Sequence, residues 1–387
     1  MARVRTPDRA DGTEPITAAT PFLPADDDFH APPDDNPFWT ETTWWSFNVP
    51  DRKLGGWLHA AFHTNRGTVT WRVYVWDPSG ATPEQLPYCK VVSDVPVTDP
   101  TPDLRDITIP GGGFSVRMLR PLRDYRIEFT DAEADFAVRL TYQGVHEPRR
   151  FTPGEPPFME HTHLDQLGHV TGEVVLSGQS IPIDCYSVRD RSWAPRGGPP
   201  PARDKRDKSV GPPTDESARV RHPGGPRWRE IERERGRGRI QYIFGHAGGD
   251  IGFLAFVRVA DGDAAGYAPL NHGWLLRDGR FELLDKSASR MKNYRDPVTG
   301  WSSHMDVQLR DVTGRVMAAE GVAVSHICER GGGSTALMRW DLDGKVGWGE
   351  DQDIWHPKHF ARMHDALATQ AAQAPEAPGV TDPRRWV

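Results

Sequence analysis

The sequence of 387 residues has few of the features that identify a membrane, disulfide-rich or zinc-binding protein. It contains three cysteines, Cys89, Cys185 and Cys328, which lie far apart and form no C-x-x-C pair. This predicts free thiols in a reducing compartment and no zinc site built on cysteine. No apolar run approaches the roughly 18 residues of a spanning helix, and the N-terminus has no apolar leader segment. We therefore expect a cytoplasmic protein without a membrane span.

The motifs of common cofactor-binding and catalytic machinery are also missing. There is no G-x-G-x-x-G after a strand, no Walker loop, no G-x-S-x-G elbow and no H-E-x-x-H. Basic and acidic residues nearly balance, with a formal net charge of −7, so the charge pattern does not indicate a nucleic-acid partner. We expect no cofactor, no resident metal and no nucleic acid, and the sequence does not define an oligomeric state.

Tryptophan, glycine and proline are the residues in excess. Fourteen tryptophans accompany 38 glycines and 35 prolines, a composition that favours strands, turns and an aromatic-lined cavity over a helical bundle. Apolar and polar residues alternate over 124–142 and 173–186, and Asp-Gly turns divide the segments 275–283 and 339–348. Short strands without amphipathic helices between them predict an all-β protein made of antiparallel barrels or sandwiches.

The composition divides the chain into an N-terminal segment and two β domains. Residues 1–30 are rich in Pro, Asp and Ala and are expected to be flexible. We expect a first β domain over 31–157 and a second over 158–387. A Pro- and Arg-rich insertion at 197–226 interrupts the second domain, and a helix is expected at about 357–374.

The residues around Asp190 form the densest group of candidates for catalysis. On a strand that ends near Val188, alternation places Tyr186 and Asp190 on one face and Arg189 on the other. An aromatic-walled pocket would favour the neutral carboxyl, so Asp190 could act as a general acid near neutral pH. Direct pairing with Arg189 or Arg191 would instead keep Asp190 charged, as a base or a structural anchor.

His161 and His163 are two residues apart, so a strand would place both rings on the same face, as metal ligands require. No cysteine and no second close-spaced pair accompany them. Histidines with ordinary hydrogen bonds are therefore favoured over a metal site. A single acid–base pair, such as His163 with Asp165 or Asp190, is the intermediate alternative.

Two further segments supply candidate substrate-binding residues. Trp348 and Glu350 belong to an acidic segment near the end of the chain, whose spacing is not that of an EF-hand loop. Trp44 and Trp45 are neighbours, so a strand would turn one inward and the other outward. Accessible aromatic faces suit a flat apolar ligand and can stabilise a developing carbocation. The candidate substrate-binding residues are Trp45, Tyr186, Trp193, Tyr242, Trp348 and Glu350.

Residues 188–196, VRDRSWAPR, resemble the R-D-x-S-W segment of the double-lipocalin superfamily. That superfamily includes hydroxyneurosporene synthase (a carotenoid hydratase), AttH-like proteins and fungal Diels–Alderases. The segments 34–39, 44–47 and 347–352 are similar to an uncharacterised bacterial branch of it. The resemblance covers about residues 30–365 apart from the insertion.

This resemblance implies two lipocalin-like β domains side by side and a cofactor-free hydrophobic pocket for a terpenoid-, carotenoid-, steroid- or polyketide-like molecule. Asp190 and Trp193 match the acidic and aromatic residues of the hydratases' D-x-x-W segment, whereas Arg191 and Ser192 stand where hydratases tend to carry a His-bearing pair. We expect a cofactor-independent hydratase, lyase or isomerase. Asp190 would transfer the proton, His163 would assist as partner or relay, and Arg191 is the third candidate catalytic residue.

Two other functions are compatible with the sequence. A lipocalin-like barrel is a good container for apolar molecules, so the protein could be a non-catalytic carrier of a hydrophobic small molecule. In a carrier, Asp190 would be paired with Arg189 or Arg191. In a third interpretation the insertion at 197–226 recruits a partner, and its deletion would abolish function while Asp190→Asn would not.

Overall fold

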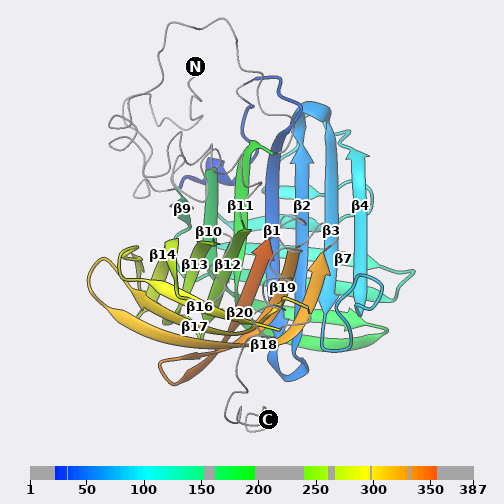
Figure 1. Cartoon of the computed structure of the whole chain (residues 1–387). Coiled ribbons are helices and arrows are strands. Elements are labelled where there is room, and N and C mark those ends of the chain that lie inside the picture. Colours follow the sequence, from blue (N-terminus) through cyan, green and yellow to red (C-terminus); the bar gives the residue numbers. More distant parts are fainter. Residues whose placement is uncertain are drawn as a thin grey trace, which may run out of the picture.

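The structure, a computed structural model, describes seven ranges of the chain, and those ranges form antiparallel strands in two sheets (Figure 1). The described residues are 22–32, 34–151, 162–196, 239–259, 266–296, 299–329 and 333–354. The expected all-β class is confirmed. The insertion at 197–226, the helix at about 357–374 and His161 lie outside the described residues. Within these ranges, no helix has the length and apolar character needed to cross a membrane.

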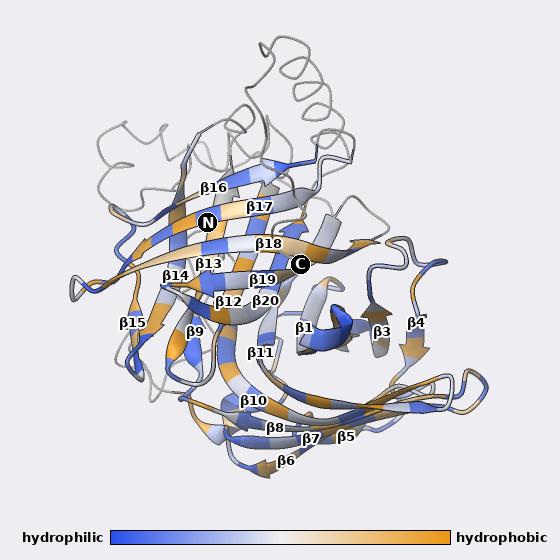
Figure 2. Ribbon diagram, turned by 90° about the horizontal axis from the view of Figure 1, so that it is seen from below, coloured by the Kyte–Doolittle hydropathy of each residue, from blue (hydrophilic) through white to orange (hydrophobic). Residues whose placement is uncertain are grey.

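The first sheet contains the first eleven strands. They are β1 (Trp39–Val49), β2 (Leu54–His63), β3 (Thr68–Trp76), β4 (Tyr88–Pro96), β5 (Asp106–Thr108), β6 (Ser115–Arg120), β7 (Asp124–Asp131), β8 (Phe136–Gly144), β9 (Arg149–Phe151), β10 (Thr162–Leu176) and β11 (Gln179–Pro195). Their order is β4-β3-β2-β1-β11-β10-β8-β7-β6-β5, with β9 paired to β10. This sheet curves into a half-barrel (Figure 2). Three short 3₁₀ turns accompany it: η1 (Pro24–Asp27), η2 (Pro50–Arg52) and η3 (Thr64–Arg66).

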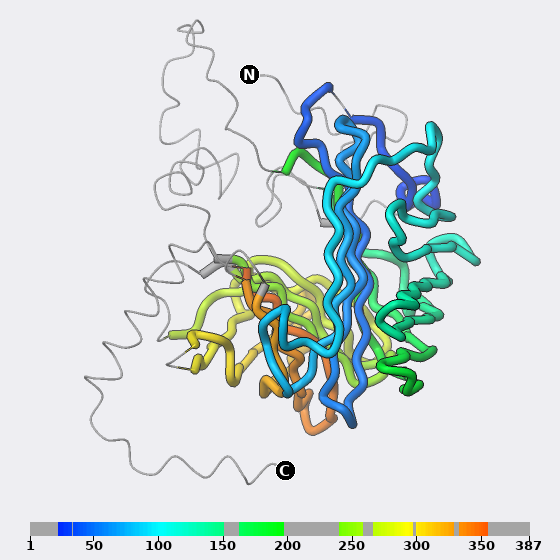
Figure 3. The backbone as a smooth tube through the Cα atoms, turned by 90° about the vertical axis from the view of Figure 1, so that its right-hand side faces the viewer, coloured from blue at the N-terminus to red at the C-terminus, as the bar shows by residue number. Residues whose placement is uncertain are grey.

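The second sheet closes into a barrel. Its strands are β12 (Arg239–His246), β13 (Ile251–Val259), β14 (Ala268–Arg277), β15 (Arg280–Leu283), β16 (Arg290–Arg295), β17 (Ser302–Arg310), β18 (Val316–Glu329), β19 (Gly333–Leu342) and β20 (Lys345–Ile354). The order β13-β12-β20-β19-β18-β17-β16-β14 is completed by pairing of β13 with β14, and β15 lies beside β14. The barrel stands next to the outer face of the half-barrel (Figures 2 and 3).

The sheets divide the strands later in the chain than the expected boundary at residue 157. β10 and β11, which sequence analysis placed in the second domain, pair with β8 and β1 in the first sheet. Apolar alternation identifies a strand but says nothing about its partner, because pairing depends on residues far away in the sequence. The division between the two sheets falls between Pro195 and Arg239.

The predicted hairpins form where local turn chemistry indicated them. β10–β11, β14–β15 and β19–β20 turn at residues 177–178, 278–279 and 343–344. In each turn a Ser or Asp precedes a Gly, and both have positive φ, between 48° and 87°. This is the backbone of a two-residue type I′ turn, which favours Asn-Gly and Asp-Gly because glycine adopts positive φ without a steric penalty.

Three large apolar clusters and one small one are present among the described residues. One lies inside the curve of the half-barrel, where Trp45 contacts Tyr125 and Tyr142 across the sheet. A second fills the closed barrel around Trp340. The third joins the outer face of the half-barrel to β12–β14 and includes Trp44. The contact between the two sheets is therefore an apolar core in its own right.

His246 lies at the end of β12, close to the contact between the two sheets. Its burial leads us to expect that the protein loses stability in acid. The side chain of His246 is 3% exposed, and neither ring nitrogen has a hydrogen-bond partner among the described residues. Burial, with a smaller contribution from the charge of His146, lowers the pKa of His246 to about 3. The unfolded chain, with a pKa of about 6.5 at this histidine, binds the proton first, so acidification below that value favours unfolding.

Because of His246, we expect the free energy of unfolding to fall by about 2 kcal/mol when the pH falls from about 7 to about 5. His246→Phe should flatten the pH dependence by that amount, as measured by urea unfolding at both pH values. An equal slope in wild type and His246→Phe would contradict the prediction.

Candidate acid–base site

The register of three neighbouring strands brings the candidate residues together. His163 and Asp165 are two residues apart on β10 and share a face. Asp165 is directly opposite Asp190 on β11, and Asp190 is directly opposite Trp44 on β1. Because directly paired residues of antiparallel strands point to the same side, these four side chains form one group on the outer face of the half-barrel. That face is turned toward the barrel.

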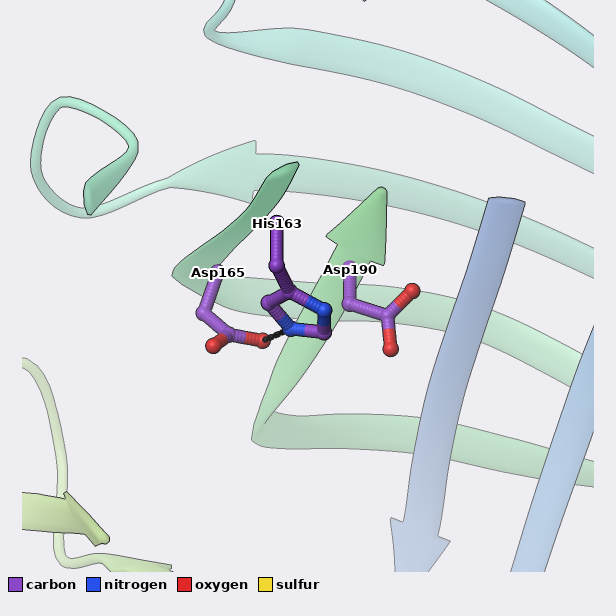
Figure 4. A group of neighbouring side chains, drawn as sticks. All are labelled: His163, Asp165 and Asp190. Carbon is purple, nitrogen blue, oxygen red and sulfur yellow. Dashed lines mark hydrogen bonds and ion pairs between the residues drawn. The ribbon is translucent and has the colours of Figure 1, made fainter. Parts of the chain in front are cut away.

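A tyrosine of the barrel completes the hydrogen bonding of this group. His163 donates from Nε2 to Oδ1 of Asp165 at 3.1 Å, and the hydroxyl of Tyr242 donates to the same oxygen at 2.9 Å. The imidazole lies between the two carboxyl groups (Figure 4). His163 and Asp165 are buried, whereas Asp190 is only partly buried. Asp190 is therefore the acid of the group that a ligand could contact.

The environment raises the pKa values of both Asp190 and His163. Burial raises the pKa of Asp190 to about 6, the charge of Asp165 adds to the increase, and the charge of His163 opposes it. Burial alone would lower the pKa of His163, but the Asp165 carboxylate outweighs it and raises that pKa. Near pH 6, a substantial fraction of Asp190 is therefore a neutral acid beside a positively charged imidazole.

Aromatic rings surround the group on the barrel side. The ring of Tyr242 lies 6.3 Å from that of Trp44 and 4.6 Å from that of Phe256, and the imidazole of His163 lies 6.0 Å from the Phe256 ring. Such walls exclude water and strengthen electrostatic interactions within the site. Their faces can also stabilise a nearby positive charge.

The same three side chains have a spacing that could hold a metal ion. One potential ligand atom from each of His163, Asp165 and Asp190 lies within 4.8 Å of the others. Oδ2 of Asp165 is buried and has no hydrogen-bond partner among the described residues. An imidazole and two carboxylates are a ligand set that zinc and similar cations accept. The expectation of no metal stays a prediction.

The two arginines considered as partners of Asp190 lie on the opposite face of β11. Arg189 donates to Oε1 of Gln166 at 2.8 Å and to Oδ1 of Asp27 at 2.9 Å. Arg191 donates to the carbonyl oxygen of Thr42 at 2.7 Å and pairs with a glutamate. Asp190 is therefore not held by either guanidinium. Arg191, expected to be catalytic, affects Asp190 through its charge, which lowers the pKa of the carboxyl.

Trp45 and Trp193 are also separated from Asp190. Trp45 packs inside the half-barrel, 5.0 Å from Tyr125 between ring centroids. Trp193 stacks on His30 at 3.7 Å and belongs to a small cluster with the N-terminal segment. Their expected role in binding a substrate near Asp190 is not supported by these positions, because the sheet lies between them and the carboxyl.

The other expected binding residues lie at or near the contact between the two sheets, Tyr186 on the half-barrel and Trp348 and Glu350 on the barrel. Tyr186 stacks on His169 at 4.9 Å, further along β11 from Asp190. Trp348 packs against the apolar cluster between the two sheets. Glu350 accepts a hydrogen bond from Nε1 of Trp57 at 3.1 Å and so links the barrel to the half-barrel. Among the predicted binding residues, Tyr242 makes the direct contact with the acid–base group.

Sequence reasoning missed Trp44 and Phe256 and treated Asp165 only as a possible partner of His163. Trp44 and Trp45 cannot be distinguished without the register of β1 against β11, which alone places Trp44 opposite Asp190. Phe256 comes from the barrel, and no local pattern links it to β10. For Asp165 a signal was present, because its two-residue spacing from His163 places both on one face of a strand.

Residues 23–202 match the model of a family described as a domain of unknown function (DUF7064), and this match includes the whole first sheet. No curated protein matches the chain in sequence. A putative AttH from Nitrosomonas europaea has a solved structure with 12% identity and a TM-score of 0.52, over 88% of this chain and 99% of that one. The structure of kievitone hydratase from Nectria haematococca has 9% identity and a TM-score of 0.44, over 82% of this chain and 88% of that one. The structure of CghA has 12% identity and a TM-score of 0.46, over 83% of this chain and 89% of that one.

The likeness to the AttH structure defines the class of fold. The chain is a protein of two lipocalin-like β domains, an open half-barrel and a closed barrel, and the resemblance in fold to AttH-like proteins is confirmed. The DUF7064 match coincides with the half-barrel that carries His163, Asp165 and Asp190. A shared fold does not determine a reaction, so the function has to be argued from the site.

Proposed function

We propose that the protein is a cofactor-independent hydratase, lyase or isomerase, in which Asp190 transfers a proton to or from an apolar, unsaturated small molecule. The observation that carries the proposal is the environment of Asp190. It is a partly exposed carboxyl group whose pKa is raised to about 6, next to an imidazole that a buried carboxylate holds in place. A general acid works best when its pKa is close to the operating pH.

In the direction of hydration, neutral Asp190 donates its proton to one carbon of an alkene. A C–H bond forms, the π bond breaks and the other carbon becomes a cation, while Asp190 becomes a carboxylate. Water then attacks the cation, forming a C–O bond, and the extra proton of that water returns to the Asp190–His163 pair. The reverse sequence is elimination, and loss of a different proton from the cation gives an isomer.

The neighbouring side chains have separate tasks in this scheme. Asp165 orients the imidazole of His163, and Tyr242 holds Asp165, an arrangement that follows the logic of a catalytic triad. The rings of Trp44 and Phe256 help to exclude water and stabilise the cation. Proton transfer by a positioned group supplies about 10²–10⁴-fold of a rate enhancement, and positioning and electrostatics supply the rest.

We also infer that the protein acts in the cytoplasm, because its three cysteines, Cys89, Cys185 and Cys328, are odd in number and far apart in the sequence, which is not the pattern of a disulfide framework. A terpenoid-, steroid- or polyketide-like substrate would suit the aromatic surroundings of Asp190. The alternative, a carrier of such molecules, shares the fold and the aromatic surroundings but makes no use of the raised pKa of Asp190.

The proposal can be tested by incubating wild type and Asp190→Asn with terpenoid, steroid and aromatic alkenes and alcohols in H₂¹⁸O, followed by mass spectrometry. Asp306→Asn is a matched control, because Asp306 accepts a hydrogen bond from His304 in a similar pair that is partly exposed. We expect a mass-shifted or isomerised product from wild type and Asp306→Asn only, with or without a chelator. Retention of the same unmodified ligand by all three proteins would favour the carrier.

A further inference from the structure

The row of side chains that holds Asp190 continues across two more strands of the half-barrel. Trp44 is directly opposite Asp190 on one side and His59 of β2 on the other. His59 is in turn directly opposite Arg72 of β3. Directly paired residues of antiparallel strands point to the same side, so all these side chains are on the outer face. Neighbouring strands are about 4.8 Å apart, which places His59 roughly 10 Å from Asp190 along the row.

His59 is a fixed hydrogen-bond donor in this row. Nε of Arg72 donates to Nδ1 of His59 at 3.2 Å, so the proton of the neutral ring is on Nε2. Burial, together with the charges of Arg72 and Arg196, lowers the pKa of His59 well below its ordinary value and keeps the ring neutral. The His59 side chain is partly exposed, and its Nε2 has no hydrogen-bond partner among the described residues. It is therefore able to donate to a ligand.

Arg196 adds a cation to the same face. It directly follows β11, and its side chain turns back so that Nη2 donates to Oγ of Ser192. Ser192 is two residues from Asp190 and shares its face of the strand. Arg196 is exposed, and within the described ranges this neutral hydroxyl is the only partner of its guanidinium. Its positive charge acts on both Asp190 and His59.

The sheet between these groups carries only short side chains. They form the row next to that of Asp190, each directly opposite the next, and are Ser192, Thr42, Ala61 and Thr70. Ala61 and Thr70 are partly exposed although β2 and β3 are inner strands of the sheet. A ligand group can therefore approach the sheet here, within reach of the Arg196 guanidinium and Nε2 of His59 and close to the Asp190 carboxyl.

We propose that Arg196 and His59 bind an anionic oxygen group, a carboxylate or a phosphate, of the molecule on which Asp190 acts. The planar guanidinium of Arg196 matches the geometry of such a group, and Nε2 of His59 donates a further hydrogen bond. Arg72 is a positioning residue, because it holds the imidazole with Nε2 as the donor. The inference rests on the proposed function, and it narrows the substrate to an unsaturated acid whose anionic group lies roughly 10 Å from the reacting double bond.

Charge balance favours an anion at this position during the proposed reaction. Asp190 has to be neutral when it donates its proton, and in that state it no longer offsets the charge of Arg196. An anion bound beside Arg196 restores the balance. Its charge also favours the neutral form of Asp190, because two negative groups close together disfavour ionisation. Binding of an anionic substrate therefore prepares the acid for proton transfer.

The site can be tested with three probes that share an apolar part and differ in charge: 4-phenylbutanoate, 3-phenylpropyl phosphate and 4-phenylbutanol. Isothermal titration calorimetry with the full chain measures their affinities without turnover. We expect at least one anion to bind about tenfold or more tightly than the alcohol, because hydrogen bonds to a charged group are the stronger ones. Arg196→Gln should remove that difference, and Arg196→Lys should restore part of it. Equal affinities for the anions and the alcohol, or no binding of either anion, would overturn the proposal.

Arg290→Gln is the matched control. Arg290 is also exposed and also donates to a neutral side chain, Oε1 of Gln308 at 2.7 Å, but it lies on the barrel. This variant should bind the anions as wild type does. An equal loss in Arg290→Gln and Arg196→Gln would assign the effect to the overall charge of the protein and contradict the site. His59→Phe should weaken binding of the anions and leave binding of the alcohol unchanged.

Asp190→Asn separates this inference from the proposed reaction. The variant keeps Arg196 and His59, so it should bind the anions at least as tightly as wild type, because a neutral amide replaces the nearby carboxylate. Weaker binding of the anions by Asp190→Asn would contradict a site beside Asp190. If no alkene is converted but the preference for anions depends on Arg196, the reaction fails and the anion site stands. If neutral alkenes are converted and the anions do not bind, the reaction stands and the anion site fails.

Discussion

Replacement of His163 by glutamine is expected to slow the Asp190-dependent reaction by about 10²–10⁴-fold, the range that positioned acid–base groups supply. The imidazole lies between Asp165 and Asp190 and is the group through which the buried Asp165–Tyr242 pair can act on the reacting acid (Figure 4). Glutamine keeps a polar side chain of similar length but cannot accept and release a proton. The rate of product formation, measured on the substrate that the labelling experiment identifies, checks this.

The pH profile distinguishes this role from a purely structural one. In wild type the rate should fall as the pH rises through about 6, because Asp190 loses the proton that it donates. The charge of His163 lowers the pKa of Asp190, so its removal should move this decline to higher pH. His304→Gln, in the more exposed His304–Asp306 pair, should change neither the rate nor the profile. A His163→Gln profile that keeps its wild-type midpoint would contradict the proposed contact.

Replacement of Arg295 by methionine is expected to destabilise the protein by about 3–5 kcal/mol, the cost of breaking a buried ion pair. Arg295 donates from Nη1 to Oδ2 of Asp353 at 2.6 Å inside the barrel, and both side chains are almost inaccessible. The neighbouring Asp351 is buried as well, and burial, with the charge of Asp353, raises its pKa to about 7. Without Arg295, these two buried acidic groups would lose the cation that now pairs with Asp353.

The loss should depend on pH in a defined direction. The folded pKa of Asp351 lies above its unfolded value of about 3.8, so the folded state keeps its proton more readily. The stability associated with that proton is complete below the unfolded pKa and is lost as the pH rises toward about 7. The charge of Arg295 lowers the pKa of Asp351, so Arg295→Met should raise that pKa further. The substitution should therefore be less destabilising at about pH 5, where Asp351 keeps its proton in both proteins, than at about pH 7.5, where only the wild type has this cation beside the carboxylate.

Urea unfolding at the two pH values measures both effects of Arg295→Met. Adding Asp353→Asn should recover part of the loss, because it removes one of the two acidic groups. Arg290 lies on the same strand and is exposed, so Arg290→Met should lower the free energy of unfolding by no more than about 0.5 kcal/mol. A loss for Arg295→Met that is as small as that of Arg290→Met would show that the pair contributes little.

Local patterns predicted the strands and turns but could not predict their assembly. Period-two alternation and Ser-Gly or Asp-Gly turns depend on neighbouring residues, so the hairpins at 177–178, 278–279 and 343–344 could be read directly from the sequence. The assignment of β10 and β11 to the half-barrel depends on β1 and β8, which are far away in the chain. The expected boundary at residue 157 was based on local composition and alternation, which do not show which strands pair.

The candidate site shows the same limit at the level of single residues. Alternation along β11 correctly separated Asp190 from Arg189, and it also places Trp193, three residues beyond Asp190, on the other face. The resemblance to the D-x-x-W segment nevertheless favoured Trp193 as a substrate-binding residue, although alternation turns it away from Asp190. Tyr242 was expected among the pocket residues, but only the packing of the barrel against the half-barrel shows that it bonds to Asp165.

Among the described strands, the open half-barrel ends in two edges, and in many β proteins such an edge lets a second chain add a strand. One of them, β5, is only three residues long. The other, β4, carries Lys90, ends at Pro96 and is distorted near Asp94, whose φ is +54° and where the register against β3 shifts. Short length, charge, proline and a bulge all interfere with edge-to-edge pairing. The half-barrel can therefore stay open at high concentration without becoming a template for aggregation.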